Sequence, residues 1–168
     1  MLRIAKIIDA INNAIGRAFS LLMIPLVLIA SYEVMMRYIF SRPTIWAWDL
    51  NIQVFAAIIM LGGGYTFLKD QHVRVDVLTS RLSAKHRQIL DVTLTPLFLF
   101  MATFALMIQG WSMAWMSFEI RETVATVWAP PYYYMKAMIP VGAFFLFLQG
   151  VSELIKGVKK LNDLKVGE

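Results

Sequence analysis

A few ionisable residues lie where an apolar chain could use them for proton or ion chemistry. Glu33 and Arg37 are four residues apart with the acid first, a spacing that pairs side chains on one face of a helix. Asp49 opens the next apolar stretch, within reach of Arg37 or Arg42 across a short turn. All of them lie near the ends of apolar stretches, since a charge at mid-membrane would cost ~2.5 to 3.5 kcal/mol. The spacing therefore favours structural ion pairs over a proton-carrying site.

Metal and redox chemistry find little support in the sequence. His72 and Asp76 are four residues apart and offer two possible metal ligands, but no further histidine or cysteine is near them in the sequence. His86 lies in the same charged segment as His72, so no apolar stretch offers an axial histidine for haem. We therefore predict no metal site, no cofactor and no catalytic residue, and the protein is not expected to be an enzyme.

The composition indicates a membrane protein. The chain has 168 residues, of which 59% are apolar and 16% are charged. A soluble domain carries nearer a quarter of charged residues, and one small core could not bury so much apolar surface. The net charge of +5 does not indicate nucleic acid as a partner, because the basic residues cluster beside apolar stretches.

Four apolar stretches are long enough to cross a membrane, which needs about 20 helical residues for ~30 Å of hydrocarbon. We expect an all-α protein with a single membrane domain over residues 1–168. The expected spans are approximately residues 18–36, 50–68, 92–118 and 134–153. Residues 1–17 and part of the loop 69–91 have apolar residues at helical spacing, which is typical of amphipathic helices at a membrane surface. The first span is expected to be a retained anchor and not a signal peptide.

The distribution of positive charge predicts the orientation. Only four of the 16 Lys and Arg residues lie in the two loops that follow the first and third spans. The positive-inside rule then places both termini and the loop 69–91 in the cytoplasm.

Several other residues are candidates for packing, anchoring or docking. Gly62, Gly63 and Gly64 could let another helix approach closely, and Gln109 could donate a hydrogen bond to another helix. Aromatic residues near the outer surface are expected to anchor the spans at the interface: Trp46, Trp48, Trp128, Tyr132 and Tyr133. Charged residues expected to face outward could dock a partner: Arg42, Glu119, Arg121 and Glu122.

These motifs together resemble the small, DctQ-like membrane subunit of tripartite ATP-independent periplasmic (TRAP) transporters. The resemblance covers nearly the whole chain. It is carried by Glu33-x-x-x-Arg37-Tyr38, the Pro43 turn, Trp46-Ala47-x-Asp49, Gly63 with Tyr65, and His72-Val73-Arg74-Val75-Asp76. The sequence departs from the family at Asp49, where many members have Glu.

The resemblance implies a non-catalytic scaffold in the bacterial inner membrane. In that family an extracytoplasmic binding protein delivers an organic acid or related solute to the membrane subunits, and a sodium gradient drives uptake. The large subunit binds the sodium and the substrate, so this chain is expected to hold no cofactor and to have the large subunit, the binding protein and lipids as partners. The alternative is a self-sufficient proton-coupled exporter that acts as a dimer, with Glu33 as its proton site.

Overall fold

The structure is a computed structural model and describes residues 2–69 and 84–166. It contains five helices within these ranges: α1 Leu2–Ser20, α2 Met23–Tyr38, α3 Ala47–Leu68, α5 Ala84–Glu119 and α6 Tyr133–Val166. Four helical stretches are long and apolar enough to cross a membrane: Leu2–Tyr38, Ala47–Leu68, Val92–Glu119 and Tyr133–Asn162. The predicted class, an all-α membrane protein with four spans, is therefore confirmed.

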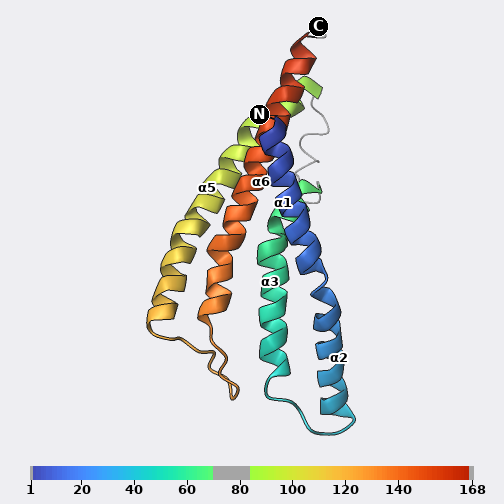
Figure 1. Cartoon of the computed structure of the whole chain (residues 1–168), viewed down its shortest axis with the longest axis vertical. Coiled ribbons are helices and arrows are strands. Elements are labelled where there is room, and N and C mark those ends of the chain that lie inside the picture. The colour runs from blue at the N-terminus through green and yellow to red at the C-terminus, as the bar shows by residue number, and fades with distance from the viewer. Residues whose placement is uncertain (1, 70–83, 167–168) are drawn as a thin grey trace.

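The helices form a row in which α6 holds a central place (Figure 1). On one side α6 packs against α5, and on the other it packs against α3 and α1, while α2 contacts α3. Both ends of the described chain lie at the same end of the bundle, which we call the terminal end (Figure 1). The turn between α2 and α3 and the loop between α5 and α6 lie at the opposite end, which we call the loop end.

The first span is built from two helices, and Pro25 accounts for the break between them. A proline ring clashes with the carbonyl four residues earlier, which here belongs to Leu21. The Leu21 carbonyl instead accepts a bond from the amide of Ile24 at 3.1 Å, and α1 ends at Ser20. Pro25 itself lies in the first turn of α2, where its missing amide leaves no bond unmade. The chain therefore continues in nearly the same direction as α2 (Figure 1).

The α1 helix is packed into the bundle along its length, a feature that the sequence did not indicate. Its buried residues follow helical spacing and face α3 and α6: Ala5, Ile8, Asn12 and Gly16. Its other apolar residues, such as Ile4 and Ile7, remain exposed. The amphipathic pattern of residues 1–17 thus has a buried, partly polar face against two other helices.

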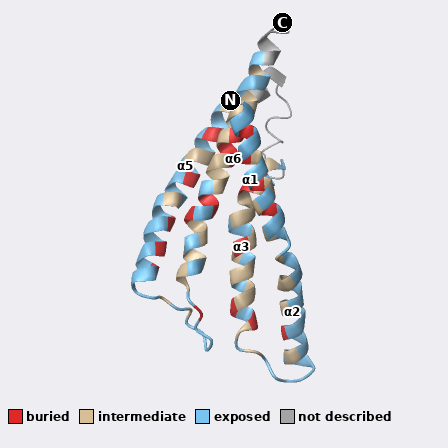
Figure 2. Cartoon of the chain, viewed as in Figure 1, coloured by how far each residue is buried: buried red, intermediate tan, exposed pale blue. Residues whose placement is uncertain are grey.

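Burial is inverted relative to a soluble protein (Figure 2). The largest side chains that are fully buried are polar: Gln149, Asn12, Thr103, Ser117 and Ser152. Large apolar side chains face outward along every described helix, with Leu28 and Phe98 about two-thirds exposed. Lipid can solvate apolar side chains but not polar groups, so membrane helices pack small and polar residues against one another.

One glycine sets the distance between α3 and α6. A Cβ atom added at Gly142 would lie 2.1 Å from the backbone oxygen of Met60. Only glycine allows the two backbones to approach this closely, which gives α3 and α6 more dispersion contacts. The contact holds α3 against the central helix.

Candidate functional site

The loop end of α2 is organised around the carboxylate of Glu33. Arg37 Nη2 lies 2.7 Å from Glu33 Oε1, one helical turn further along α2. The other oxygen, Oε2, accepts hydrogen bonds from the backbone amide of Thr44 at 3.1 Å and from its hydroxyl group. Glu33 is buried, with 8% of its surface exposed. The carboxylate therefore holds the turn between α2 and α3 against the end of α2.

Asp49 has a different partner from the arginines that the sequence suggested. The hydroxyl of Thr126 donates to Asp49 Oδ2 at 2.6 Å, while Arg37 is engaged by Glu33. Asp49 is also buried, in the first turn of α3, where a carboxylate interacts favourably with the helix dipole. This contact joins the start of α3 to the loop between α5 and α6.

That loop, residues 120–132, folds as a hairpin. The amide of Val124 donates to the carbonyl of Pro130, and the amide of Tyr132 donates to the carbonyl of Glu122, each at 2.9 Å. Arg121 and Ala129 adopt positive φ angles of 49° and 47°, which turn the chain at each side of the hairpin. The bonds across the hairpin give the loop a defined shape although it contains two consecutive prolines.

The base of the hairpin carries an ion pair that the sequence did not reveal. Lys136, in the first turn of α6, donates to Glu122 Oε2. The hydrogen bond from Lys136 holds the pKa of the Glu122 carboxyl below its usual value. Lys136 also lies 5.0 Å from the centre of the Tyr132 ring, a cation–π contact. The pair fastens the end of the hairpin to α6.

The four predicted docking residues lie at the loop end on separate segments. Arg42 is exposed in the turn between α2 and α3, and Arg121 is exposed in the hairpin. Glu119, the last residue of α5, accepts a hydrogen bond from Trp115 Nε1 at 2.8 Å. Glu122 is half-buried by its pair with Lys136. The structure therefore leaves the two arginines with the greatest freedom to meet a partner.

The predicted aromatic anchors also lie at this end, in two environments. Trp46 stacks on Tyr32, with ring centres 6.1 Å apart, and Tyr133 meets Phe118 edge-on at 5.6 Å. Trp48 is 66% exposed and Trp128 in the hairpin is 40% exposed, so both can reach the membrane interface.

The candidate packing residues differ in how closely another helix approaches them. A Cβ atom at Gly64 would lie 2.3 Å from Asn12 Oδ1, so α1 approaches α3 closely there. A Cβ atom added at Gly62 or Gly63 would meet no other atom within 4 Å. Gln109 is exposed on α5. Within this chain, Gly64 alone among these four residues lies at a tight helix contact.

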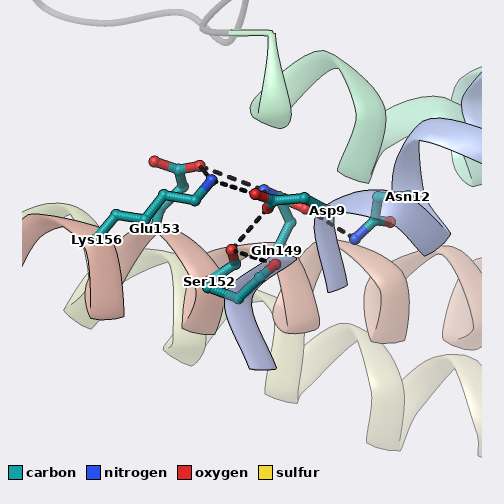
Figure 3. Close-up of polar contacts among 7 residues, drawn as sticks. Asp9, Asn12, Gln149, Ser152, Glu153 and Lys156 are labelled. Atoms are coloured by element: carbon teal, nitrogen blue, oxygen red, sulfur yellow. Dashed lines mark hydrogen bonds and ion pairs between the residues drawn. The ribbon is translucent and has the colours of Figure 1, made fainter. Parts of the chain in front are cut away.

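A polar cluster between α1 and α6 is the largest feature that sequence reasoning missed (Figure 3). Asn12 donates to Gln149 Oε1 at 2.9 Å, and Gln149 donates to Asp9 Oδ1 at 3.0 Å. The hydroxyl of Ser152 also donates to Asp9 Oδ1, at 2.7 Å. Lys156 completes the cluster, with its ammonium 2.8 Å from Asp9 Oδ2. The spacing of these residues on the two helices, one turn apart each time, is the sequence signal that could have revealed them.

The polar groups of this cluster nearly all have partners, and its two carboxylates share one ammonium group. Asn12 and Gln149 are buried, and the carboxylates of Asp9 and Glu153 both pair with Lys156. One buried oxygen, Asn12 Oδ1, has no hydrogen-bond partner. The cluster connects the first and last helices and offers no reacting group.

His72, Arg74 and Asp76 lie outside the described residues. Among the side chains that the structure describes, which exclude those of residues 84–91 and 163–166, no group of three or more His, Cys, Asp or Glu could hold a metal ion.

A scan against protein-family models matched residues 26–160 to a family described as tripartite ATP-independent periplasmic transporters, DctQ component. The matched segment begins within α2 and includes both loops at the loop end and the α6 residues of the polar cluster. A search of curated proteins found no match.

Proposed function

Because the chain belongs to the DctQ component family of tripartite ATP-independent periplasmic transporters, we propose that it is the scaffold subunit of a sodium-driven importer of an organic acid or related solute. Family membership makes it a small membrane component of a transporter and not an enzyme. The finer role, a stationary support for the large membrane subunit, is our proposal.

The placement of charge within the spans carries this proposal. The central stretches at residues 21–32, 50–68, 92–118 and 137–152 contain no Asp, Glu, Lys, Arg or His. Ion and proton pathways through a membrane use such residues, or broken helices whose carbonyls coordinate the ion at mid-membrane. These stretches lack such ionisable residues, and the break between α1 and α2 has no second broken span to pair with among the described helices, which suits a supporting role with sodium and solute bound by the large subunit.

The contacts at the loop end suit a rigid support. Glu33 holds the turn after α2, Asp49 holds the hairpin to α3, and Glu122 holds the hairpin to α6. These three carboxylates hold both loops to the ends of the helices, and the contact of Asp49 joins residues 77 positions apart in the sequence, so the loop end resists relative movement of the spans. We propose that this rigid end faces the periplasm and that Arg42 and Arg121 help to dock the binding protein.

The exporter alternative assigns a proton to Glu33 during each transport cycle. Both Glu33 oxygens already accept hydrogen bonds, from Arg37 and from Thr44, and the residue lies in the last turns of α2. A proton carrier would have to break these contacts in each cycle and reach both sides of the membrane. We therefore favour the structural role.

Replacement of Glu33 distinguishes the two functions. In proteoliposomes that hold both membrane subunits and the binding protein, Glu33→Gln should retain sodium-driven uptake when the rate is normalised to assembled complex. A matched Glu119→Gln variant changes the same charge at the same end. Loss of coupled transport in Glu33→Gln with normal assembly would instead support a proton-carrying role.

A further inference from the structure

A groove at the terminal end of the bundle combines apolar walls with two basic side chains. It lies between the start of α1 and the last turns of α6 and has a volume of about 750 Å³. Its walls include Leu2, Ile155 and Val158, and its polar residues are Arg3, Lys159 and Asn162. An apolar wall beside cationic groups is the chemistry that recognises an amphiphile with an anionic head.

The two basic residues of the groove differ from their neighbour Lys156. The ammonium of Lys156 lies 2.8 Å from both Asp9 Oδ2 and Glu153 Oε1. Among the carboxylates whose side chains the structure describes, which exclude residues 84–91 and 163–166, none lies within ion-pair distance of Arg3 or Lys159. The charge of Lys156 is compensated by two carboxylates, and no such pair is assigned to the two basic residues that line the groove.

The position of the groove along the bundle matches that of the phospholipid headgroups in a bilayer. At ~1.5 Å per residue, Lys159 lies about 39 Å along α6 from Tyr133, which begins the helix at the loop end. The hydrocarbon of a bilayer is ~30 Å thick, and the bilayer with its headgroups is ~40 to 45 Å thick. With Tyr133 at one membrane surface, Arg3 and Lys159 reach the phosphates of the other, while Ile155 and Val158 lie nearer the hydrocarbon.

We propose that this groove binds an anionic phospholipid, with the phosphate between Arg3 and Lys159 and an acyl chain along Ile155 and Val158. Basic pockets between membrane helices select such lipids because the local positive charge compensates the phosphate. A free phosphate ion would gain nothing from the apolar wall, so the whole groove fits a lipid better than it fits an inorganic anion. The lipid would join the first and last helices at their outermost contact, beyond the polar cluster. This inference does not depend on the proposed function.

Binding of two defined lipids to the purified full-length chain tests the charged part of the groove. Dioleoyl phosphatidylglycerol should be retained in native mass spectra in preference to dioleoyl phosphatidylcholine. The double variant Arg3→Gln with Lys159→Gln should bind phosphatidylglycerol about five- to thirtyfold more weakly. The matched double variant Lys6→Gln with Lys160→Gln removes the same charge from residues that do not line the groove and should bind normally. Equal weakening in both double variants would overturn the proposal in favour of general surface charge.

The apolar part of the groove needs its own test. Val158→Trp should fill the groove and reduce phosphatidylglycerol binding while both basic residues remain, and Val158 is exposed enough to accept the larger ring. Glycerol 3-phosphate at the same concentration should not displace the lipid. Normal lipid binding in Val158→Trp, or displacement by glycerol 3-phosphate, would overturn the lipid assignment.

The occupant in the assembled transporter can be identified by photo-crosslinking. A benzophenone amino acid placed at Leu154, another wall residue, should give adducts with the mass of a phospholipid when both membrane subunits are present. A protein adduct in place of the lipid would overturn the proposal.

Discussion

Individual polar contacts hold the loop end of this protein together. The contribution of the Glu122–Lys136 pair to stability can be measured as a function of pH. The Glu122 carboxylate accepts a hydrogen bond from Lys136, which holds the pKa of the carboxyl below its usual value of 4.5. A lowered folded-state pKa means that the pair stabilises the fold fully above the unfolded-state pKa. That stabilisation is lost as the pH falls through the folded-state pKa.

We therefore expect Glu122→Gln to lower the thermal unfolding temperature at neutral pH, with the difference from the wild type narrowing as the pH falls below 4.5 and through the lower folded-state pKa. Unfolding of the detergent-solubilised chain between pH 3 and 7 measures this. Glu119→Gln is the control, since Glu119 pairs with the ring nitrogen of Trp115 and not with a cation. A difference that stays constant down to pH 3 would contradict the assigned ion pair.

Arg121 allows a test of docking at the same end. It is exposed in the hairpin, so Arg121→Glu should weaken delivery by the binding protein without affecting assembly of the membrane subunits. The expected loss is ~1 kcal/mol or less, about fivefold, at low ionic strength, because exposed ion pairs are weak and are screened by salt. Uptake measured against binding-protein concentration gives the result. Lys160→Glu, at the terminal end, should leave uptake unchanged, and an unchanged Arg121→Glu would remove the residue from the interface.

Local and distant contacts differ in how far the sequence can predict them. Glu33 and Arg37 are one turn apart on the same helix, so their proximity follows from helical geometry alone. Asp49 meets Thr126, which is 77 residues away. That contact depends on how α3 packs against α6 and on the shape of the hairpin, neither of which the sequence spacing contains.

The close contact between α3 and α6 predicts that a larger residue at Gly142 destabilises the bundle. Gly142→Ala would place a methyl group 2.1 Å from the Met60 carbonyl oxygen, which belongs to the backbone and cannot rotate away. The two helices must then separate, at a cost of about 1 to 3 kcal/mol. Thermal unfolding in detergent should show a clear decrease for Gly142→Ala. Gly62→Ala adds the same methyl group where no atom lies within 4 Å, and equal stability of the two variants would contradict the packing.

The helices themselves were predictable, but the packing of α1 was not. Charge-free stretches indicated four spans because lipid excludes charge, and four such helices are present. Residues 2–20 have an amphipathic pattern, which does not distinguish a helix on a membrane surface from one packed on other helices. The distinction depends on Asp9 and Asn12 meeting Gln149 and Ser152 of α6, a match between two faces that is invisible in either helix alone.

The two ends of the bundle carry different charge, which predicts the orientation of the protein in the membrane. The chain contains no cysteine, so single cysteines can report the side of the membrane without background. Ala125→Cys, in the hairpin, should react with a membrane-impermeant maleimide in intact cells. Lys160→Cys, in the last turns of α6, should react only after permeabilisation. The reverse pattern would contradict the cytoplasmic placement of the termini.

The inverted burial of this chain leaves a large apolar surface to be covered. Its largest buried side chains are polar, and its large apolar side chains face outward. Such a surface can be covered by lipid or by another membrane protein. The central stretches of the spans contain no charged residue, which is why we propose that the partner carries the transport chemistry. The contribution of a support of this kind would appear only in the assembled transporter.

Reconstituted uptake shows whether transport by the large subunit requires this chain. Proteoliposomes that contain the large subunit, supplied with binding protein, solute and a sodium gradient, should take up solute only when this chain is also present. The binding protein should bind solute equally well in both cases. Uptake at the full rate by the large subunit without this chain would contradict the proposed role.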